Sequence, residues 1–267
     1  MKTVQALMGL RGRVAVVTGG AGHIGSAIGE ALAECGAAIV VVDRTADPCK
    51  ETAARISAGH GVQTMPLVLD LADPTAPAAL PAEVLRRFGR LDILVNCAAF
   101  VGTSKLPGWT VPFAEQSGQS WRACLEVNLT APFLLTQSCA PALAGSGHGS
   151  VINIASTYGV VGPDMRLYEG TTMGNPAAYG ASKGGLLQLT RWLATVLAPR
   201  VRVNAITPGG VARNQPAPFT ERYLQRTPLA RMAVEEDFKG AAVYLASDLS
   251  AYVTGHNLVV DGGWTAW

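Results

Sequence analysis

Short apolar runs separated by amphipathic segments recur along the whole chain. Runs of four to eight apolar residues bounded by glycine or polar residues are typical of strands buried on both faces of a parallel sheet. Apolar residues at helical spacing, such as Ile24, Ile28, Ala31 and Leu32, mark the segments between them. Strands are predicted at 14–17, 38–42, 64–69, 91–95, 150–154, 201–206 and 258–260, and helices from 24 and at 47–58, 74–88, 119–144, 177–198, 220–226 and 235–246. The pattern predicts an α/β fold, a doubly wound parallel sheet in one domain of residues 1–267.

A glycine-rich turn follows the first predicted strand. Residues 18–25 read Thr-Gly-Gly-Ala-Gly-His-Ile-Gly. Between a strand and a helix, such a turn brings bare backbone N–H groups and a helix N-terminus up to a pyrophosphate. The second predicted strand ends at Asp43, where a carboxylate can bind the adenosine ribose hydroxyls and would repel a 2′-phosphate. Together, the turn and Asp43 predict NAD as the cofactor.

Polar residues follow two further strands. Asp70 comes directly after the strand at 64–69, and Asn96 after the strand at 91–95. Doubly wound sheets bind ligands outside the carboxyl ends of their strands, so both residues are candidates for that crevice. Asn128 lies in the middle of the helix predicted at 119–144, where a buried amide needs partners; it is therefore either functional or surface-facing.

Tyr179 and Lys183 form a candidate acid/base pair. Asn175 is a good helix N-cap and Pro176 suits the first helical position. A helix starting there places Tyr179 and Lys183 on one face, four residues apart. A phenol titrates near pH ~10, and a neighbouring ammonium favours its ionised form, so the pair could act as a general acid/base nearer neutrality.

Composition narrows the class of protein. With 21 basic and 19 acidic residues the net charge is +2, and no basic run carries interleaved aromatics, so we expect no nucleic-acid partner. Five cysteines without a C-x-x-C pair indicate reduced thiols in a cytoplasmic protein. The four histidines show no metal-ligand spacing, which predicts no metal site. No apolar run approaches the ~20 residues that span a membrane, and no secretory signal is expected at the N-terminus.

In their order along the chain, these motifs resemble the one-domain short-chain dehydrogenase/reductase family over nearly the whole length. The matching pieces are the turn 18–25, Asp70, the stretch 96–99, Asn128, Ser156, Tyr179 with Lys183, Pro208 with Gly209, and 261–263. The resemblance implies a single Rossmann-type domain that moves a hydride between C4 of a nicotinamide and a carbon bearing oxygen. The substrate is then a small molecule.

The resemblance also implies roles for individual residues. The catalytic set is Asn128, Ser156, Tyr179 and Lys183. Tyr179 is the acid/base, Ser156 binds the substrate oxygen, and Lys183 lowers the pKa of Tyr179 and holds the nicotinamide ribose. Asn128 anchors a water that links Lys183 to solvent. The implied cofactor-binding residues are Gly19, Gly22, His23, Ile24, Gly25, Asp43, Asp70, Leu71, Asn96, Ala98, Tyr179, Lys183, Pro208, Gly209 and Val211.

Four departures from the family pattern stand out. The turn reads T-G-x-x-G-x-x-G, a spacing similar to the extended branch that includes sugar-nucleotide epimerases, and 96–99 reads Asn-Cys-Ala-Ala in place of N-N-A-G. Ser156 and Tyr179 are 23 residues apart, where the family usually has about 12 or 13, so an insertion within 158–175 should bulge at the mouth of the site. It contains Tyr168, which has no lysine four residues on. Arg213 replaces the usual threonine of the Pro-Gly loop.

These departures bear on the substrate. Arg166 and Arg213 are candidates for contacts to an anionic substrate group. The resulting prediction is an NAD-dependent dehydrogenase of a sugar, polyol or sugar acid. The alternatives are a 3-oxoacyl-type carbonyl reductase, which would normally use the NADPH that Asp43 disfavours, a sugar-nucleotide epimerase, and a non-catalytic NAD-binding regulator. Family members usually form tetramers through the helices beginning near 119 and 177, so a homotetramer or homodimer is expected.

Overall fold

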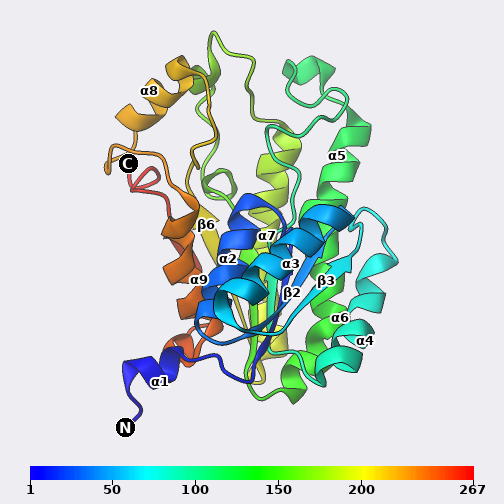
Figure 1. The fold of residues 1–267 in the computed structure, drawn as a ribbon. Helices are drawn as coiled ribbons and strands as arrows, with labels where there is room; N and C mark the ends of the chain where they lie inside the picture. Colours follow the sequence, from blue (N-terminus) through cyan, green and yellow to red (C-terminus); the bar gives the residue numbers. More distant parts are fainter.

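The computed structural model describes residues 1–267, and seven parallel strands form its single sheet (Figure 1). The strands are β1 (Val14–Thr18), β2 (Ala38–Asp43), β3 (Thr64–Val68), β4 (Ile93–Asn96), β5 (Gly149–Ile154), β6 (Val201–Pro208) and β7 (Asn257–Val260). They lie in the order β3-β2-β1-β4-β5-β6-β7. The predicted doubly wound α/β fold is therefore confirmed.

Helices cover both faces of this sheet. They are α1 (Val4–Met8), α2 (His23–Glu34), α3 (Ala46–His60), α4 (Ala76–Phe88), α5 (Gly118–Leu125), α6 (Ala131–Gly145), α7 (Ala177–Leu197), α8 (Ala217–Gln225) and α9 (Lys239–Ala246). The core on one face joins α2, α3 and α9, and the core on the other joins α4, α6 and α7. Alternate residues of one strand enter the two cores: Val17 packs with the first layer and Val16 with the second. No helix is long and apolar enough to cross a membrane.

The predicted helix 119–144 is interrupted by a π-helical turn. Helix α5 ends at Leu125, residues Glu126–Thr130 form the π turn, and α6 begins at Ala131. Such turns are rare and often mark functional sites, because they displace one backbone group from the regular ladder. Asn128 lies inside this turn.

The start of α7 also differs from the prediction. Pro176, in an extended conformation, is the N-cap, and Ala177 is the first helical residue. The expectation that Asn175 caps the helix was wrong, because Pro176 takes the cap position with φ −72° and ψ 142°. Tyr179 and Lys183 nevertheless lie on one α7 face, as the spacing predicted.

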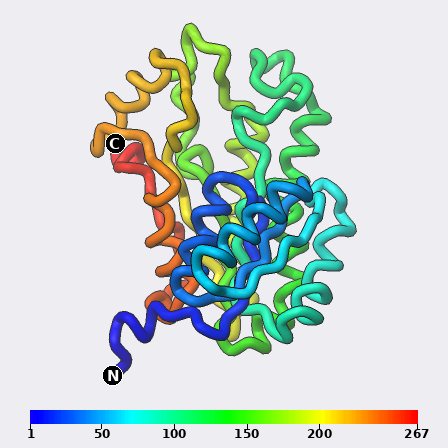
Figure 2. The backbone as a smooth tube through the Cα atoms, viewed as in Figure 1, coloured from blue at the N-terminus to red at the C-terminus, as the bar shows by residue number.

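All seven strands end at one edge of the sheet, and the order reverses between β1 and β4. This is the position where open α/β sheets bind ligands. Above this edge, Figure 1 shows α8, the segment between β5 and α7, and the loop before α5, and Figure 2 traces these three excursions with the C-terminus beside α8. The fold thus provides a crevice with three covering segments.

Candidate active site

The glycine turn forms one end of the site. Gly19 has φ +62°, and a Cβ atom there would lie 2.8 Å from the Cα of Ala98. A Cβ at Gly25 would collide with the Gly19 carbonyl oxygen. Only glycine fits both positions, since the turn and its neighbour touch backbone to backbone. Gly22 caps α2 without a side-chain hydrogen bond, and His23 and Ile24 are the first helical residues, so the N-terminal N–H groups face outward without a side-chain cap.

Asp43 lies beside this turn. Its Oδ2 accepts the N–H of Ala21 at 3.2 Å and its Oδ1 accepts the N–H of Arg44 at 2.8 Å. The carboxylate is therefore fixed at the carboxyl end of β2, next to the glycine turn. Asp70 is exposed, accepts the N–H of Ala72 at 3.0 Å, and precedes the buried Leu71.

Asn96 closes the crevice at the end of β4. Its side chain is 3% exposed, and its Nδ2 donates to Asn153 Oδ1 at 2.8 Å. Its Oδ1 has no hydrogen-bond partner, although buried acceptors are normally paired. Thr18 Oγ1 accepts the N–H groups of Cys97 and Ala98 at 3.0 and 3.2 Å, and burial raises the pKa of the Cys97 thiol to about 11.

These observations fit a dinucleotide. The glycine cradle leaves room for a backbone-bound pyrophosphate, Asp43 offers acceptors for ribose hydroxyls, and the unpaired Asn96 oxygen offers an acceptor near β1 and β4. Pro208 ends β6 at the same edge, and the next residue, Gly209, approaches Asp261 so closely that a Cβ would lie 2.8 Å from the Cα of Asp261.

Lys183 is buried beneath the crevice. Its side chain is 3% exposed, and its Nζ donates to the Ile154 carbonyl oxygen at 2.6 Å. Burial lowers the pKa of Lys183 to about 8. The ammonium lies 5.9 Å from the centroid of the Tyr179 ring. The lysine is therefore poised to gain or lose its proton close to neutrality.

Tyr179 and Ser156 meet above Lys183. Burial raises the pKa of Tyr179, and the Ser156 side chain acts against that shift by hydrogen bonding to the phenol. Ser156 is 7% exposed, and its Oγ also accepts the N–H of Tyr158 at 3.2 Å. The hydrogen bond with Ser156 thus lowers the pKa of Tyr179, against the effect of burial, while the Lys183 ammonium donates to the Ile154 carbonyl oxygen.

Asn128 fastens the loop before α5 to α7. It is 1% exposed, and its Oδ1 accepts the N–H of Phe100 at 2.7 Å. Its Nδ2 donates to the Phe100 carbonyl at 2.9 Å and to Ser182 Oγ at 3.1 Å. The predicted need for partners is met by protein groups, and Ser182 precedes Lys183 directly.

The insertion joins an aromatic cluster that motif analysis missed. The cluster consists of Tyr158, Tyr168, Phe219, Tyr223 and Trp264. The Tyr158 and Tyr168 hydroxyls lie 2.7 Å apart, and Tyr158 packs edge-on against Trp264 with ring centroids 5.9 Å apart. Tyr223 stacks on Trp264, and its hydroxyl accepts the Gly210 N–H at 2.5 Å. The insertion is thus anchored to α8 and the C-terminus.

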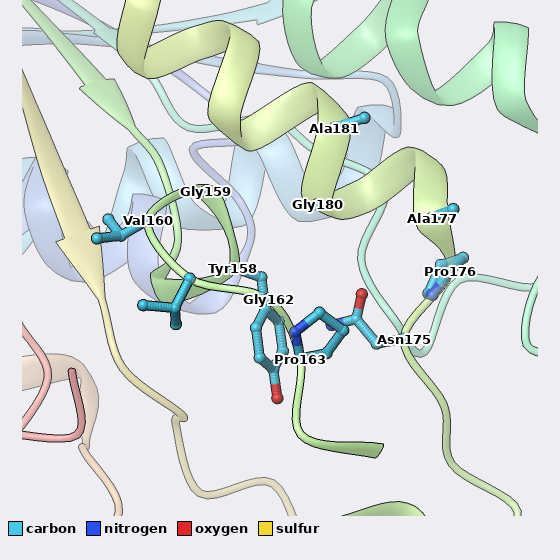
Figure 3. Close-up of a pocket in the computed structure, with 11 residues that line it drawn as sticks. Tyr158, Gly159, Val160, Gly162, Pro163, Asn175, Pro176, Ala177, Gly180 and Ala181 are labelled. Atoms are coloured by element: carbon cyan, nitrogen blue, oxygen red, sulfur yellow. The ribbon is translucent and has the colours of Figure 1, made fainter. Parts of the chain in front are cut away.

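A surface pocket of about 340 Å³ lies between the residues after β5 and the start of α7 (Figure 3). Figure 3 shows the Tyr158 ring, Pro163 and Asn175 grouped on one side of it. Gly180 and Ala181 line it, whereas Ser156, Tyr179 and Lys183 do not. Asn175 therefore borders this pocket and does not cap α7.

Both candidate substrate arginines already have carboxylate partners. The Arg166 side chain is 78% exposed and pairs with Asp164 through contacts of 2.8 and 2.9 Å. Arg213 Nη2 lies 2.7 Å from Glu235 Oε1, and the backbone of nearby Val211 forms a bridge with Ala233. The structure brings Ser156, Tyr179 and Lys183 together, but it directs these two arginines to internal acids.

Comparison with known protein families adds independent evidence. A family model described as Enoyl-(Acyl carrier protein) reductase matches residues 19–265. D-Threitol dehydrogenase of Mycolicibacterium smegmatis is 35% identical over 96% of this chain and 94% of its own. 2-Dehydro-3-deoxy-D-gluconate 5-dehydrogenase of Dickeya dadantii is 34% identical over 96% and 97%. 3-Oxoacyl-[acyl-carrier-protein] reductase FabG of Aquifex aeolicus is 31% identical over 95% and 98%.

Solved structures agree on the fold. A short-chain type dehydrogenase/reductase from Mycobacterium marinum has a TM-score of 0.87 at 29% identity, covering 100% of both chains. A gluconate 5-dehydrogenase from Burkholderia cenocepacia J2315, in complex with NADP and tartrate, has a TM-score of 0.87 at 30% identity, covering 99% of this chain and 100% of that one.

Proposed function

The chain belongs to the short-chain dehydrogenase/reductase family and is an oxidoreductase acting on CH–OH groups, and from that premise we propose that it is an NAD-dependent dehydrogenase of a sugar, polyol or sugar acid. The observation that carries this proposal is the meeting of Ser156, Tyr179 and Lys183 beside a glycine turn that fits a dinucleotide. A protein that only senses NAD has no need of such a proton-transfer group.

The chemistry requires one hydride and one proton to leave the alcohol. The bound nicotinamide supplies the hydride acceptor, or the donor in the reverse direction. The Ser156 hydroxyl would hold the substrate oxygen, and Tyr179, in its phenolate form, would take the hydroxyl proton as the carbon–oxygen double bond forms. Lys183, whose pKa is about 8, lies 5.9 Å from the centre of the Tyr179 ring, and its charged form would favour the phenolate against the effect of burial. Asn128 holds Ser182, and with it the turn of α7 that carries Lys183.

Asp43 supports the choice of NAD. Its carboxylate is fixed by Ala21 and Arg44 at the place where the adenosine ribose would lie. A 2′-phosphate there would meet a like charge, which typically costs several kcal/mol. The gluconate 5-dehydrogenase of Burkholderia cenocepacia was crystallised with NADP, and NADP is therefore the competing cofactor. The two dissociation constants decide between them, and equal values would contradict the proposal.

The substrate class is inferred from the relatives and from the walls of the site. The related D-threitol and 2-dehydro-3-deoxy-D-gluconate 5-dehydrogenases are named for a polyol and a sugar acid. The inserted segment after Ser156 also carries charged residues, among them Asp164, Arg166 and Glu169, where a long acyl chain would need apolar walls.

A 3-oxoacyl-type reductase is the second candidate. The description of the matching family model and the likeness to the Aquifex aeolicus reductase favour it. NADPH-linked reduction of an acetoacetyl thioester, faster than any NAD-linked polyol oxidation, would establish this alternative. A sugar-nucleotide epimerase would instead recycle its bound cofactor and produce no net NADH.

We also propose a cytoplasmic homotetramer or homodimer without nucleic-acid or membrane partners. Its subunits would meet through α5 and α7. Trp121 on α5 and Trp192 on α7 keep 39% and 53% of their surface exposed, which is a high value for tryptophan in a monomer. Sedimentation equilibrium measures the assembly directly.

The function is tested by a screen of NAD-linked oxidation over polyols, aldonic acids and amino sugars, with NADH formation as the signal. The Tyr179→Phe variant is the negative control, because phenylalanine preserves the packing of the ring and removes the oxygen that accepts the proton. Turnover that survives in this variant, or a complete screen without turnover by the wild type, would count against the proposal.

A further inference from the structure

Glu235 joins the loop after β6 to the glycine turn after β1, through an ion pair with Arg213 and a contact with His23, whose side chain is 71% exposed. Arg213 Nη2 lies 2.7 Å from Glu235 Oε1, and His23 Nδ1 lies 3.4 Å from the same oxygen. The side chains of Arg213 and Glu235 are only 29% and 28% exposed. His23 is the first residue of α2, so these contacts end at the helix N-terminus that belongs to the glycine turn.

These contacts cross the ligand-binding edge of the sheet. Strands β4 and β5 separate β1 from β6, and neighbouring strands lie about 4.8 Å apart, so the two strand ends are roughly 14 Å apart. Glu235 bridges this gap because it starts the 3₁₀ helix Glu235–Phe238, which packs against α2. The loop 209–216, which leaves β6 at this edge, is thereby attached to the segment that packs against α2.

Hydrogen bonds within the loop hold its side of this connection. The Gln215 side chain accepts the N–H of Arg213 at 2.6 Å and donates to the Val211 carbonyl at 2.7 Å. Between them, Asn214 adopts φ +55°, a left-handed conformation that asparagine tolerates better than most residues. This tight turn presents the Arg213 side chain to Glu235.

Hydrogen bonds also connect the segment that carries Glu235. Arg231 binds both carboxylate oxygens of Asp237 at 2.6 Å, and Asp237 Oδ2 accepts the N–H of Val234 at 2.8 Å. Val234 directly precedes Glu235, so these hydrogen bonds hold the backbone from which the Glu235 carboxylate projects. A pair of preorganised charges loses less entropy on contact than two free surface chains.

We propose that Arg213, Glu235 and His23 form a latch that holds loop 209–216 across the bound dinucleotide and slows its release. The latch rests on the proposed function, since it needs a nicotinamide dinucleotide in the crevice. In this latch Arg213 helps to retain the cofactor. Its charge is paired with Glu235 and is therefore not available to a substrate anion. Arg213 also offsets the charge of Glu235, which lies 3.4 Å from His23 in the turn that would hold the pyrophosphate.

The release rate of the cofactor tests the latch. NADH bound to the full-length protein is displaced by excess NAD in a stopped-flow instrument, and the loss of its fluorescence gives the dissociation rate. NADPH is run in parallel. An ion pair of this exposure contributes at most about 1 kcal/mol, so Arg213→Ala and Glu235→Gln should each release NADH about fivefold faster. Arg86→Ala, which removes the exposed Glu83 pair on α4, is the control and should leave the rate unchanged.

The double variant separates a latch from a direct arginine–phosphate contact. If the two residues act only through each other, Arg213→Ala in a Glu235→Gln background adds little. Additive effects, or a slower release in Glu235→Gln, would overturn the latch. Should Arg213→Ala fail to fold, the isosteric Glu235→Gln and the charge-keeping Arg213→Lys carry the test, and the latter should release NADH more slowly than Glu235→Gln.

The latch and the proposed function fail in different ways. A wild type that binds neither NADH nor NADPH refutes both. A wild type that binds NADH, with unchanged release in both single variants, refutes the latch alone. A Michaelis constant in Arg213→Ala that rises for acidic substrates only, with normal NADH release, would instead place Arg213 at the substrate.

Discussion

Replacing Tyr179 by phenylalanine separates the phenol oxygen from the rest of the side chain. The ring packs in a small cluster with Trp109, Cys124 and Ala178, and phenylalanine keeps that packing. Only the hydroxyl, with its contact to Ser156, is lost. We expect kcat to fall by about 10²–10⁴, the usual contribution of a positioned acid/base, which corresponds to about 3–5.5 kcal/mol of transition-state stabilisation.

The stability cost should be much smaller than the catalytic one. Losing one hydrogen bond costs about 1 kcal/mol, or roughly 2–4 °C in Tm for a chain of this size. The binding of NADH, followed by fluorescence titration, should change little, because the cofactor's other contacts remain. The assay therefore compares kcat, Tm and the NADH dissociation constant in one variant.

Tyr168→Phe is the matched control. It also removes one tyrosine hydroxyl, the one that lies 2.7 Å from the Tyr158 hydroxyl, and should cost a similar amount of stability. Because no lysine lies beneath Tyr168, kcat should stay within a few-fold of the wild type. A Tyr168→Phe enzyme without activity, beside an active Tyr179→Phe enzyme, would refute the assignment of the acid/base.

Three further predictions follow from the same contacts. Asp43→Ser should narrow the preference for NAD over NADP by about tenfold or more, because it removes the charge that repels a 2′-phosphate; paired dissociation constants measure this, and an unchanged ratio contradicts it. Without cofactor, the buried Lys183 loses its proton near pH 8 when folded and only near 10.5 when unfolded, so the unfolded state binds more protons between these values and the stability contributed by this residue rises with pH. The difference in free energy of unfolding between wild type and Lys183→Met should therefore shift in favour of the wild type from pH 8 to 10, and a flat or opposite trend refutes the assigned pKa. Asn128→Ala removes three buried hydrogen bonds to Phe100 and Ser182 and should cost about 2–3 kcal/mol in urea unfolding; a cost below about 0.5 kcal/mol would show that these contacts are dispensable.

Local patterns were enough to predict the sheet and the elements around it. The apolar runs identified each strand because a strand covered on both faces is mostly apolar. Every residue of β1 and of β5 is buried, including the polar Thr18, Ser150 and Asn153. The positive φ of Gly19 and the contact of Gly25 with the Gly19 carbonyl oxygen both lie within one turn, and the spacing of Tyr179 and Lys183 follows from the helical repeat. These features are encoded within one element or one turn, so the order of residues determines them.

The tertiary structure decided which side chains meet across elements. The partner of Arg213 is Glu235, and the partner of Asn128 is Phe100, each from a separate segment of the chain. The aromatic cluster draws on the insertion, α8 and the C-terminal segment, and the Lys183 ammonium meets the Ile154 carbonyl at the end of β5. Periodicity records the face on which a residue lies but not the element packed against that face. The charge of an arginine therefore appears available in the sequence, and only the folded chain shows that a carboxylate already holds it.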